Sequence, residues 1–246
     1  MDMQSRFPEI DVTRGIAILM MVLFHTLFDI SFFGIAPVNV ATGFWRYFAM
    51  ATASLFLAVV GVSLVVSHAR SAAKLSGFAL TQKYLRRGAG IFALGLLVTA
   101  ATWWYLHEGF VIFGILHLIG VSVMLSPLFF RFGRYNILIG LLIIAVGSSF
   151  HMIHGPIWLL PLGIYPASFT SVDYTPLVPW FGVVLIGLGI GEFLYAGGVR
   201  RFRIPGLPGF VADPLTFLGR HSLIIYLVHQ PVIILLLGAV TGTKVF

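Results

Sequence analysis

The residue types best suited to chemistry lie in one apolar stretch near the start of the chain, RGIAILMMVLFHTLFD. In an α-helix, Arg14 and His25 are eleven positions apart, so both side chains share one face, about 16 Å apart along the axis. Asp29 follows His25 at i+4, within reach of the imidazole ring. Imidazole is a general base near neutral pH, and a carboxylate beside it fixes its tautomer. Polar groups are costly in hydrocarbon, so this stripe indicates either interhelical hydrogen bonds or a buried reaction centre.

A second arginine and histidine occur near the end of the chain, in LGRHSLIIYLVHQP. Arg220 and His229 are nine positions apart and share roughly one face of a continuous helix. Tyr226 and Gln230 add hydrogen-bonding groups, and Pro231 would loosen the helix and free a carbonyl. Each of these residues also has a purely structural interpretation as a packing or hydrogen-bonding group.

A third histidine at predicted membrane depth is His117, in FGILHLIG. A single intramembrane histidine is more often a hydrogen-bonded packing residue than a reactive group, so both interpretations stay open. The remaining histidines are expected at membrane interfaces and are given no role: His68, His107, His151, His154 and His221.

Two predicted spans thus each carry an arginine at one end and a histidine near the midplane. An anionic ligand entering from the cytoplasm would meet Arg14 and Arg220, together with the basic pair Arg86 and Arg87. Its reactive end would then reach the histidines. This arrangement suits a long phosphorylated carrier with a thioester tip, with His25 as general base, because neutral imidazole persists in a low-dielectric site.

Composition places these residues in a membrane. The chain has 246 residues, of which 59% are hydrophobic and 9% charged, and no cysteine. A soluble domain has about 25% charged residues, so this chain cannot cover its apolar surface in water. We predict an all-α polytopic membrane helix bundle forming a single domain over residues 1–246. The first residues do not resemble a secretory signal, and without cysteine no disulfide or thiolate metal site is expected.

Seven apolar stretches each approach the roughly 20 residues that a bilayer requires. We predict membrane spans at about 11–35, 43–68, 88–106, 110–130, 137–153, 176–195 and 214–240. Lysine and arginine gather before the first span and after the second, fourth and sixth, with Arg46 and Lys244 outside this pattern. By the positive-inside rule, the N-terminus is then cytoplasmic and the C-terminus external. The net charge of +7 therefore reflects topology, and no nucleic-acid partner is expected.

Four motifs together resemble the catalytic domain of the heparan-α-glucosaminide N-acetyltransferase family, within a transmembrane acyltransferase superfamily: DVTRGIAILMMVLFHTLFD, FGILHLIG, PLVPWFGVVLIGLGIG and LGRHSLIIYLVHQP. The arginine and histidine of the first motif are similar to the signature of membrane acyltransferases that acetylate cell-surface sugars. The resemblance covers nearly the whole chain. It implies a cell-membrane enzyme that binds acetyl-CoA or another acyl-CoA from the cytoplasmic side. The acyl group would pass to an amine or hydroxyl acceptor, such as a sugar, near the outer face.

The chain departs from the eukaryotic members of that family, which are longer and have a luminal domain. In those members the histidine proposed to act lies in the loop after the first helix, and the loop here, at about 34–43, has none. Direct transfer in a ternary complex is therefore preferred, with His25 as base and Asp29 orienting it. The other predicted site residues contact the carrier or shape the thioester and acceptor pocket, with His229 or His117 polarising the carbonyl: Arg14, Arg86, Arg87, Arg220, Tyr226, His117 and His229.

Two other classes of protein could use the same polar residues. A small-molecule or lipid transporter predicts substrate flux without CoA affinity, although the sequence lacks a clear inverted repeat. A haem-binding electron carrier with two axial histidines predicts a visible absorption spectrum. The acyltransferase interpretation implies acyl-CoA, a small acceptor and membrane lipid as partners. A helical core this small is also compatible with a homo-oligomer.

Overall fold

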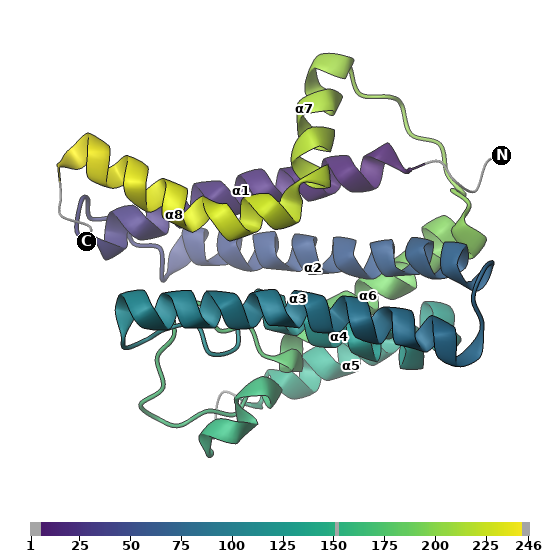
Figure 1. The fold of residues 1–246 in the computed structure, drawn as a ribbon, viewed down its shortest axis with the longest axis horizontal. Coiled ribbons are helices and arrows are strands. Elements are labelled where there is room, and N and C mark those ends of the chain that lie inside the picture. The colour runs from purple at the N-terminus through teal and green to yellow at the C-terminus, as the bar shows by residue number, and fades with distance from the viewer. Residues whose placement is uncertain (1–5, 151–152, 243–246) are drawn as a thin grey trace. The chain divides into compact units, whose positions relative to one another are not determined.

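The computed structural model describes residues 6–150 and 153–242, and within them every regular element is helical (Figure 1). His151 and Lys244 lie outside the described residues. The prediction of an all-α fold is confirmed. The elements are α1 (Pro8–Phe32), α2 (Gly43–Ala72), α3 (Gly77–Leu106), α4 (Ile115–Phe129), η1 (Phe130–Tyr135), α5 (Asn136–Gly147), η3 (Ile157–Leu162), α6 (Leu177–Tyr195), η4 (Ala196–Gly198), α7 (Gly209–Arg220) and α8 (Ser222–Thr241).

Six stretches of the described chain are long and apolar enough to cross a membrane. They are Pro8–Phe32, Gly43–Ala72, Gly77–Leu106, Ile115–Gly147, Leu177–Gly198 and Ser222–Thr241. The prediction of a polytopic membrane helix bundle is therefore confirmed, and the predicted count of seven is approximate. The fourth stretch contains two helices, α4 and α5, because the backbone at Gly133 leaves the helical region (φ 50°, ψ −127°).

The described chain divides into two compact units, which are treated separately. The central unit is Leu57–Arg203, and the terminal unit combines residues 6–56 with residues 204–242. Helix α2 therefore contributes its first residues to the terminal unit and the rest to the central unit.

In the central unit, glycines allow helices to approach closely, as is common between membrane helices. A Cβ added at Gly88 would meet Met124 and Gly120, so α3 packs directly on α4. A Cβ at Gly147 would meet Val178 and Pro179, which brings α5 against α6. Further along, Gly95 faces His117 and Gly189 faces Ile137, so both helix pairs are antiparallel.

The direction of each helix in the central unit shows that the chain reverses between α4 and α5. Lys83 and Arg87 on α3 contact Ser71 and Ser67 on α2, so these two helices are antiparallel. Helix α6 runs parallel to α2, because Gly61 faces Val184 and Gly191 faces Val65. It follows that α4 and α6 point one way and α5 the other. The two predicted spans at 110–130 and 137–153 thus exist as separate helices, each shorter than predicted.

The same contacts bring basic segments to one end of the central unit. The His68 ring of α2 stacks on Phe130 of η1 with centroids 3.8 Å apart, and Gly198 of η4 faces Ala69. The ends of α2, α4 and α6, each adjoining a predicted basic loop, therefore lie together. That this end is cytoplasmic remains a prediction from the positive-inside rule.

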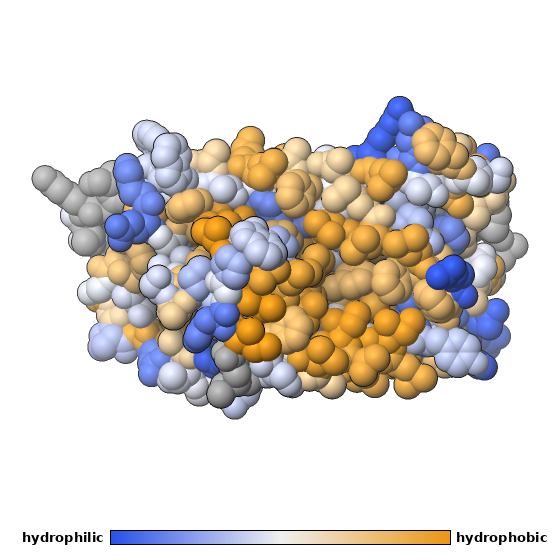
Figure 2. Space-filling model, turned by 90° about the horizontal axis from the view of Figure 1, so that it is seen from below, coloured by the Kyte–Doolittle hydropathy of each residue, from blue (hydrophilic) through white to orange (hydrophobic). Residues whose placement is uncertain are grey.

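Large apolar side chains are exposed along the helices of the central unit. Leu97 on α3 is 61% exposed, and Leu138 and Leu142 on α5 are each 64% exposed. Figure 2 shows a broad hydrophobic area on one face, with hydrophilic residues towards its ends. Apolar surface of this extent is unusual in soluble proteins and suits contact with lipid.

Two predicted helix boundaries are wrong, and both affect site residues. Helix α3 begins at Gly77 instead of at about 88, so Arg86 and Arg87 lie on the helix and not in a loop. The predicted span at 214–240 is broken at His221, which separates α7 from α8. His221 ends α7 because its backbone N–H and its ring Nδ1 both bond to the carbonyl of Phe217.

The terminal unit packs α1 against both α7 and α8. A Cβ at Gly15 would overlap the carbonyl oxygen of Leu215, and one at Gly219 would overlap that of Asp11. Figure 1 shows α7 rising steeply from the start of α1, while α8 runs alongside α1. Arg220 and His229 therefore sit on different helices, and the predicted single face that would carry both does not exist.

Candidate functional site

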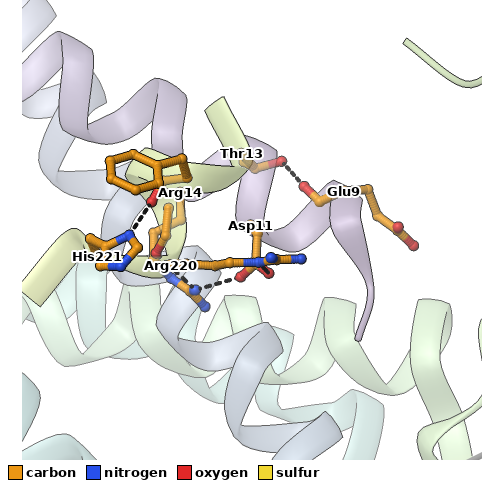
Figure 3. Close-up of polar contacts among 8 residues, drawn as sticks. Glu9, Asp11, Thr13, Arg14, Arg220 and His221 are labelled. Atoms are coloured by element: carbon orange, nitrogen blue, oxygen red, sulfur yellow. Dashed lines mark hydrogen bonds and ion pairs between the residues drawn. The ribbon is translucent and has the colours of Figure 1, made fainter. Parts of the chain in front are cut away.

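An ion cluster forms where α7 meets α1. Arg14 donates from Nη1 to Oδ1 of Asp11 at 2.9 Å and to the Gly219 carbonyl at 3.4 Å. Oδ2 of Asp11 lies 3.6 Å from Nε of Arg220 (Figure 3). The three side chains are 12% exposed for Asp11, 21% for Arg14 and 46% for Arg220. One carboxylate thus faces two guanidinium groups, and this group of three keeps a net positive charge.

The sequence prediction placed both arginines in the site but assigned Asp11 no role there. The i, i+3 spacing of Asp11 and Arg14 was the available signal, because such residues are neighbours on a helix. The contact with Arg220 could not be anticipated, since it depends on the break at His221 and on glycine at position 219. The close approach of α7 to α1 is what brings the second arginine to the first.

Two histidines meet further along α1, where α8 packs against it. The rings of His25 on α1 and His229 on α8 lie edge to face, with centroids 4.8 Å apart. His229 is buried, and its Nδ1 lies 2.6 Å from the Tyr226 carbonyl oxygen. A carbonyl only accepts hydrogen bonds, so Nδ1 donates, and the neutral ring carries its lone pair on Nε2. The sequence analysis placed both histidines in the site, and the structure brings them into contact.

The carboxylate of Asp29 joins the cluster through a different partner from the one predicted. Its Oδ1 accepts a hydrogen bond of 3.1 Å from Nε2 of Gln230 on α8, and its side chain is almost fully buried. Nδ1 of His25, Oδ2 of Asp29 and Oε1 of Gln230 are buried and have no hydrogen-bond partner within the described residues. The hydrogen bond expected between His25 and Asp29 is therefore absent there. Gln230 had been noted only as an additional polar group.

His117 belongs to the central unit and has a visible structural role. It lies in the first turn of α4, where its Nδ1 accepts the backbone N–H of Gly114 at 3.2 Å. The other ring nitrogen, which then carries the proton, lies 3.4 Å from Oγ1 of Thr99. Phe92 and Phe113 pack against the ring. Both nitrogens are engaged, as expected of a buried polar group that stabilises the fold.

The remaining predicted residues are divided between the two units. Arg86 and Arg87 are exposed near the basic end of the central unit, and Arg87 donates to Oγ of Ser67 at 3.4 Å. Tyr226 is in the terminal unit, with its ring 5.5 Å from that of His229. The structure therefore brings Arg14 to Arg220 and joins His25, Asp29, Tyr226 and His229 within one unit.

Fold and site together define a multi-pass membrane protein with a cationic cluster and a histidine cluster that share helix α1. Residues 6–231 match the family described as "Heparan-alpha-glucosaminide N-acetyltransferase, catalytic". The chain belongs to this family of membrane acetyltransferases, which confirms the resemblance found in the four motifs and supports a transferase activity. The chain has no match among curated proteins or among solved structures.

Proposed function

We propose that the chain is an acyl-CoA-dependent acyltransferase of the cell membrane. It takes an acetyl or related acyl group from cytoplasmic acyl-CoA and passes it to an amine or hydroxyl acceptor, such as a sugar, on the outer side. One observation carries the proposal: the Arg14 and Arg220 cluster and the His25 and His229 pair lie in one unit and share helix α1, which provides one member of each. Along α1 the two positions are about 16 Å apart.

The arginine cluster fits the anionic head of such a carrier. Guanidinium groups form charge-assisted, bidentate hydrogen bonds with phosphate and keep their charge in poorly solvated sites. Asp11 holds Arg14 and Arg220 to one another while leaving the group of three net positive. The exposed side chain of Arg220 is the natural first contact, and Arg14 lies deeper.

His25 serves as the general base in this proposal. It removes a proton from the acceptor nitrogen or oxygen as that atom attacks the thioester carbonyl carbon. A C–N or C–O bond forms and the C–S bond breaks. The departing CoA thiolate takes the proton held by the imidazolium, so atoms and charge balance without any further reactant.

His229 supports the base more readily than it polarises the carbonyl. Because Nδ1–H is held by the Tyr226 carbonyl, the neutral ring presents a lone pair and not a donor on Nε2. Its contact with His25 suits it to share the proton while the thiolate leaves. His117 uses both ring nitrogens in the fold, so we assign it no catalytic role.

The side of the membrane from which the carrier enters is inferred from the basic end of the central unit. Arg86 and Arg87 lie near this end, which the positive-inside rule assigns to the cytoplasm. That Arg86 and Arg87 also contact the carrier stays a prediction from the sequence. The carrier would thus enter from the side on which acyl-CoA is available.

Acetyl-CoA binding to detergent-purified protein tests the proposal. We expect saturable binding, weakened about tenfold or more in both Arg14→Ala and Arg220→Ala, because charge-assisted hydrogen bonds are lost. Free pantetheine, which lacks the phosphates of the nucleotide, should bind these variants and the wild type alike. Failure of folded wild-type protein to bind millimolar acetyl-CoA would contradict the proposal and favour a transporter.

A further inference from the structure

Three buried atoms of the histidine cluster share one chemical property. Nδ1 of His25, Oδ2 of Asp29 and Oε1 of Gln230 have no partner within the described residues. In a neutral imidazole one ring nitrogen accepts, and carboxylate and amide oxygens accept in any case. The two oxygens therefore lack donors within the described residues, since one N–H of Gln230 Nε2 is bonded to the other oxygen of Asp29. Nδ1 of His25 joins them as a third acceptor in the tautomer that carries its proton on Nε2.

Helix geometry and one hydrogen bond between helices place these three atoms near one another. His25 and Asp29 are one turn apart on α1, and such residues are neighbours on a helix surface. Gln230 bonds directly to Asp29 across the helix interface at 3.1 Å. His229, next to Gln230 on α8, contacts the ring of His25. The cluster thus consists of two residues from α1 and two from α8.

A purely structural bond between α1 and α8 accounts for this arrangement poorly. A buried polar atom without a partner is destabilising, and a structural pair normally satisfies its heteroatoms. Here one hydrogen bond is made while one oxygen of each side chain is left without a donor. His117 shows that the same chain can satisfy a buried histidine fully.

We infer that Asp29 and Gln230 form the subsite for the acyl acceptor, holding its nucleophilic N–H or O–H group against His25. This inference rests on the proposed acyltransfer and adds the residues that select the acceptor. Oδ2 of Asp29 and Oε1 of Gln230 accept donors of the acceptor, while Nδ1 of His25 faces the proton to be removed. Asp29 is then a substrate contact and not the residue that orients His25.

Charge distinguishes the two kinds of acceptor. A carboxylate attracts an amine, which carries positive charge when protonated, more strongly than a neutral hydroxyl. Asp29→Asn keeps the shape and an accepting oxygen but removes the charge. Its effect should therefore be larger with an amine acceptor than with a hydroxyl acceptor.

The test uses full-length protein in detergent, with labelled acetyl-CoA and with glucosamine and glucose as probe acceptors. Asp29→Asn and Gln230→Leu should lower kcat/KM for the acceptor by about 10- to 100-fold, the range expected for lost buried hydrogen bonds. The dissociation constant for acetyl-CoA should stay at the wild-type value, which also shows that each variant is folded. In Asp29→Asn the loss should be greater for glucosamine than for glucose.

Thr26→Val is the matched control, since Thr26 lies beside His25 but its hydroxyl donates to the Val22 carbonyl of its own helix, its one hydrogen bond within the described residues. It should retain the wild-type kinetics. An unchanged kcat/KM for the acceptor in both site variants, with transfer intact in the wild type, would overturn the inference and leave the proposed function standing. Wild-type protein that transfers acetyl to neither probe acceptor would overturn both.

Discussion

The two compact units use buried histidine in opposite ways. In the central unit, His117 has a partner for each ring nitrogen and lies among aromatic rings. In the terminal unit, His25 contacts another histidine, and its Nδ1 has no hydrogen-bond partner among the described residues. A satisfied polar group stabilises a fold, whereas an unsatisfied one retains capacity for a ligand. Residue type and membrane depth alone do not separate these two cases.

The largest expected effect comes from removing the proposed base. His25→Ala should reduce turnover by about 10²- to 10⁴-fold, the usual contribution of general-base catalysis. Acetyl-CoA binding should remain near normal, because the arginine cluster is on a different part of α1. Paired measurements of acetyl transfer and acetyl-CoA affinity check this. More than a few per cent of residual activity would show that His25 is not the base.

A clash between α1 and α7 should have the next largest effect. A Cβ at Gly219 would overlap the Asp11 carbonyl oxygen, so Gly219→Ala must push the helices apart at a cost of about 1–3 kcal/mol or more. We expect weaker acetyl-CoA binding as Arg220 moves away from Asp11. Gly90→Ala is the control, because its Cβ would meet nothing within 4 Å. Wild-type affinity in Gly219→Ala would show that the cluster does not need this contact.

Replacement of His117 sharpens the contrast with His25. His117→Ala leaves the buried Gly114 N–H without its acceptor and opens space beside Phe92. The free energy of unfolding should fall by about 1–3 kcal/mol from the unsatisfied donor alone. Thermal unfolding in detergent measures this, and the kcat of the folded fraction should match the wild type. A kcat loss like that of His25→Ala, without loss of stability, would indicate a catalytic role.

The smallest effect concerns the segment that connects α5 to α6 in the central unit, residues 153–176. The Tyr174 hydroxyl donates to the Leu160 carbonyl at 2.8 Å, and burial, aided by Tyr165, raises the pKa of Tyr174 to about 12. Tyr174→Phe should cost about 1 kcal/mol at neutral pH. Because the folded pKa is above the unfolded value of 10.0, this contribution is complete below pH 10 and lost as pH rises through about 12.

Stability of the wild type and of Tyr174→Phe, compared from pH 8 to pH 12, checks that prediction. The difference between the two proteins should shrink as the phenol ionises. Activity should be equal at neutral pH, since Tyr174 belongs to the segment between α5 and α6 and not to the histidine cluster. A constant difference across this range would mean that the hydroxyl is not buried in the folded protein.

Much of the fold could be predicted because it depends on local composition. Long apolar stretches identified the membrane helices, and the basic loops correctly grouped the ends of α2, α4 and α6. The errors arose where side chains override hydropathy. Helix α3 starts eleven residues before the predicted start at about 88, because Lys83 and Arg87 contact serines of α2. His221 ends α7 inside a stretch that was predicted as one apolar span.

The candidate site could be predicted only as far as spacing within one helix allowed. The pairing of His25 with His229 was consistent with their shared depth, but its geometry depends on how α1 packs on α8. Asp29 illustrates the limit: i+4 spacing favoured His25, yet its rotamer reaches Gln230, 201 positions away. No periodicity within a single helix identifies a partner on another.

The two segments that form the terminal unit are made at different times during synthesis, and this determines when the proposed site can form. Its helices come from the first 56 residues and from residues beyond 203, so the central unit is made in between. A nascent chain that has completed the central unit already contains Arg14, His25 and Asp29 but none of their partners on α7 and α8. The proposed site is therefore assembled last, and a chain truncated before α8 would insert helices into the membrane without its α8 residues.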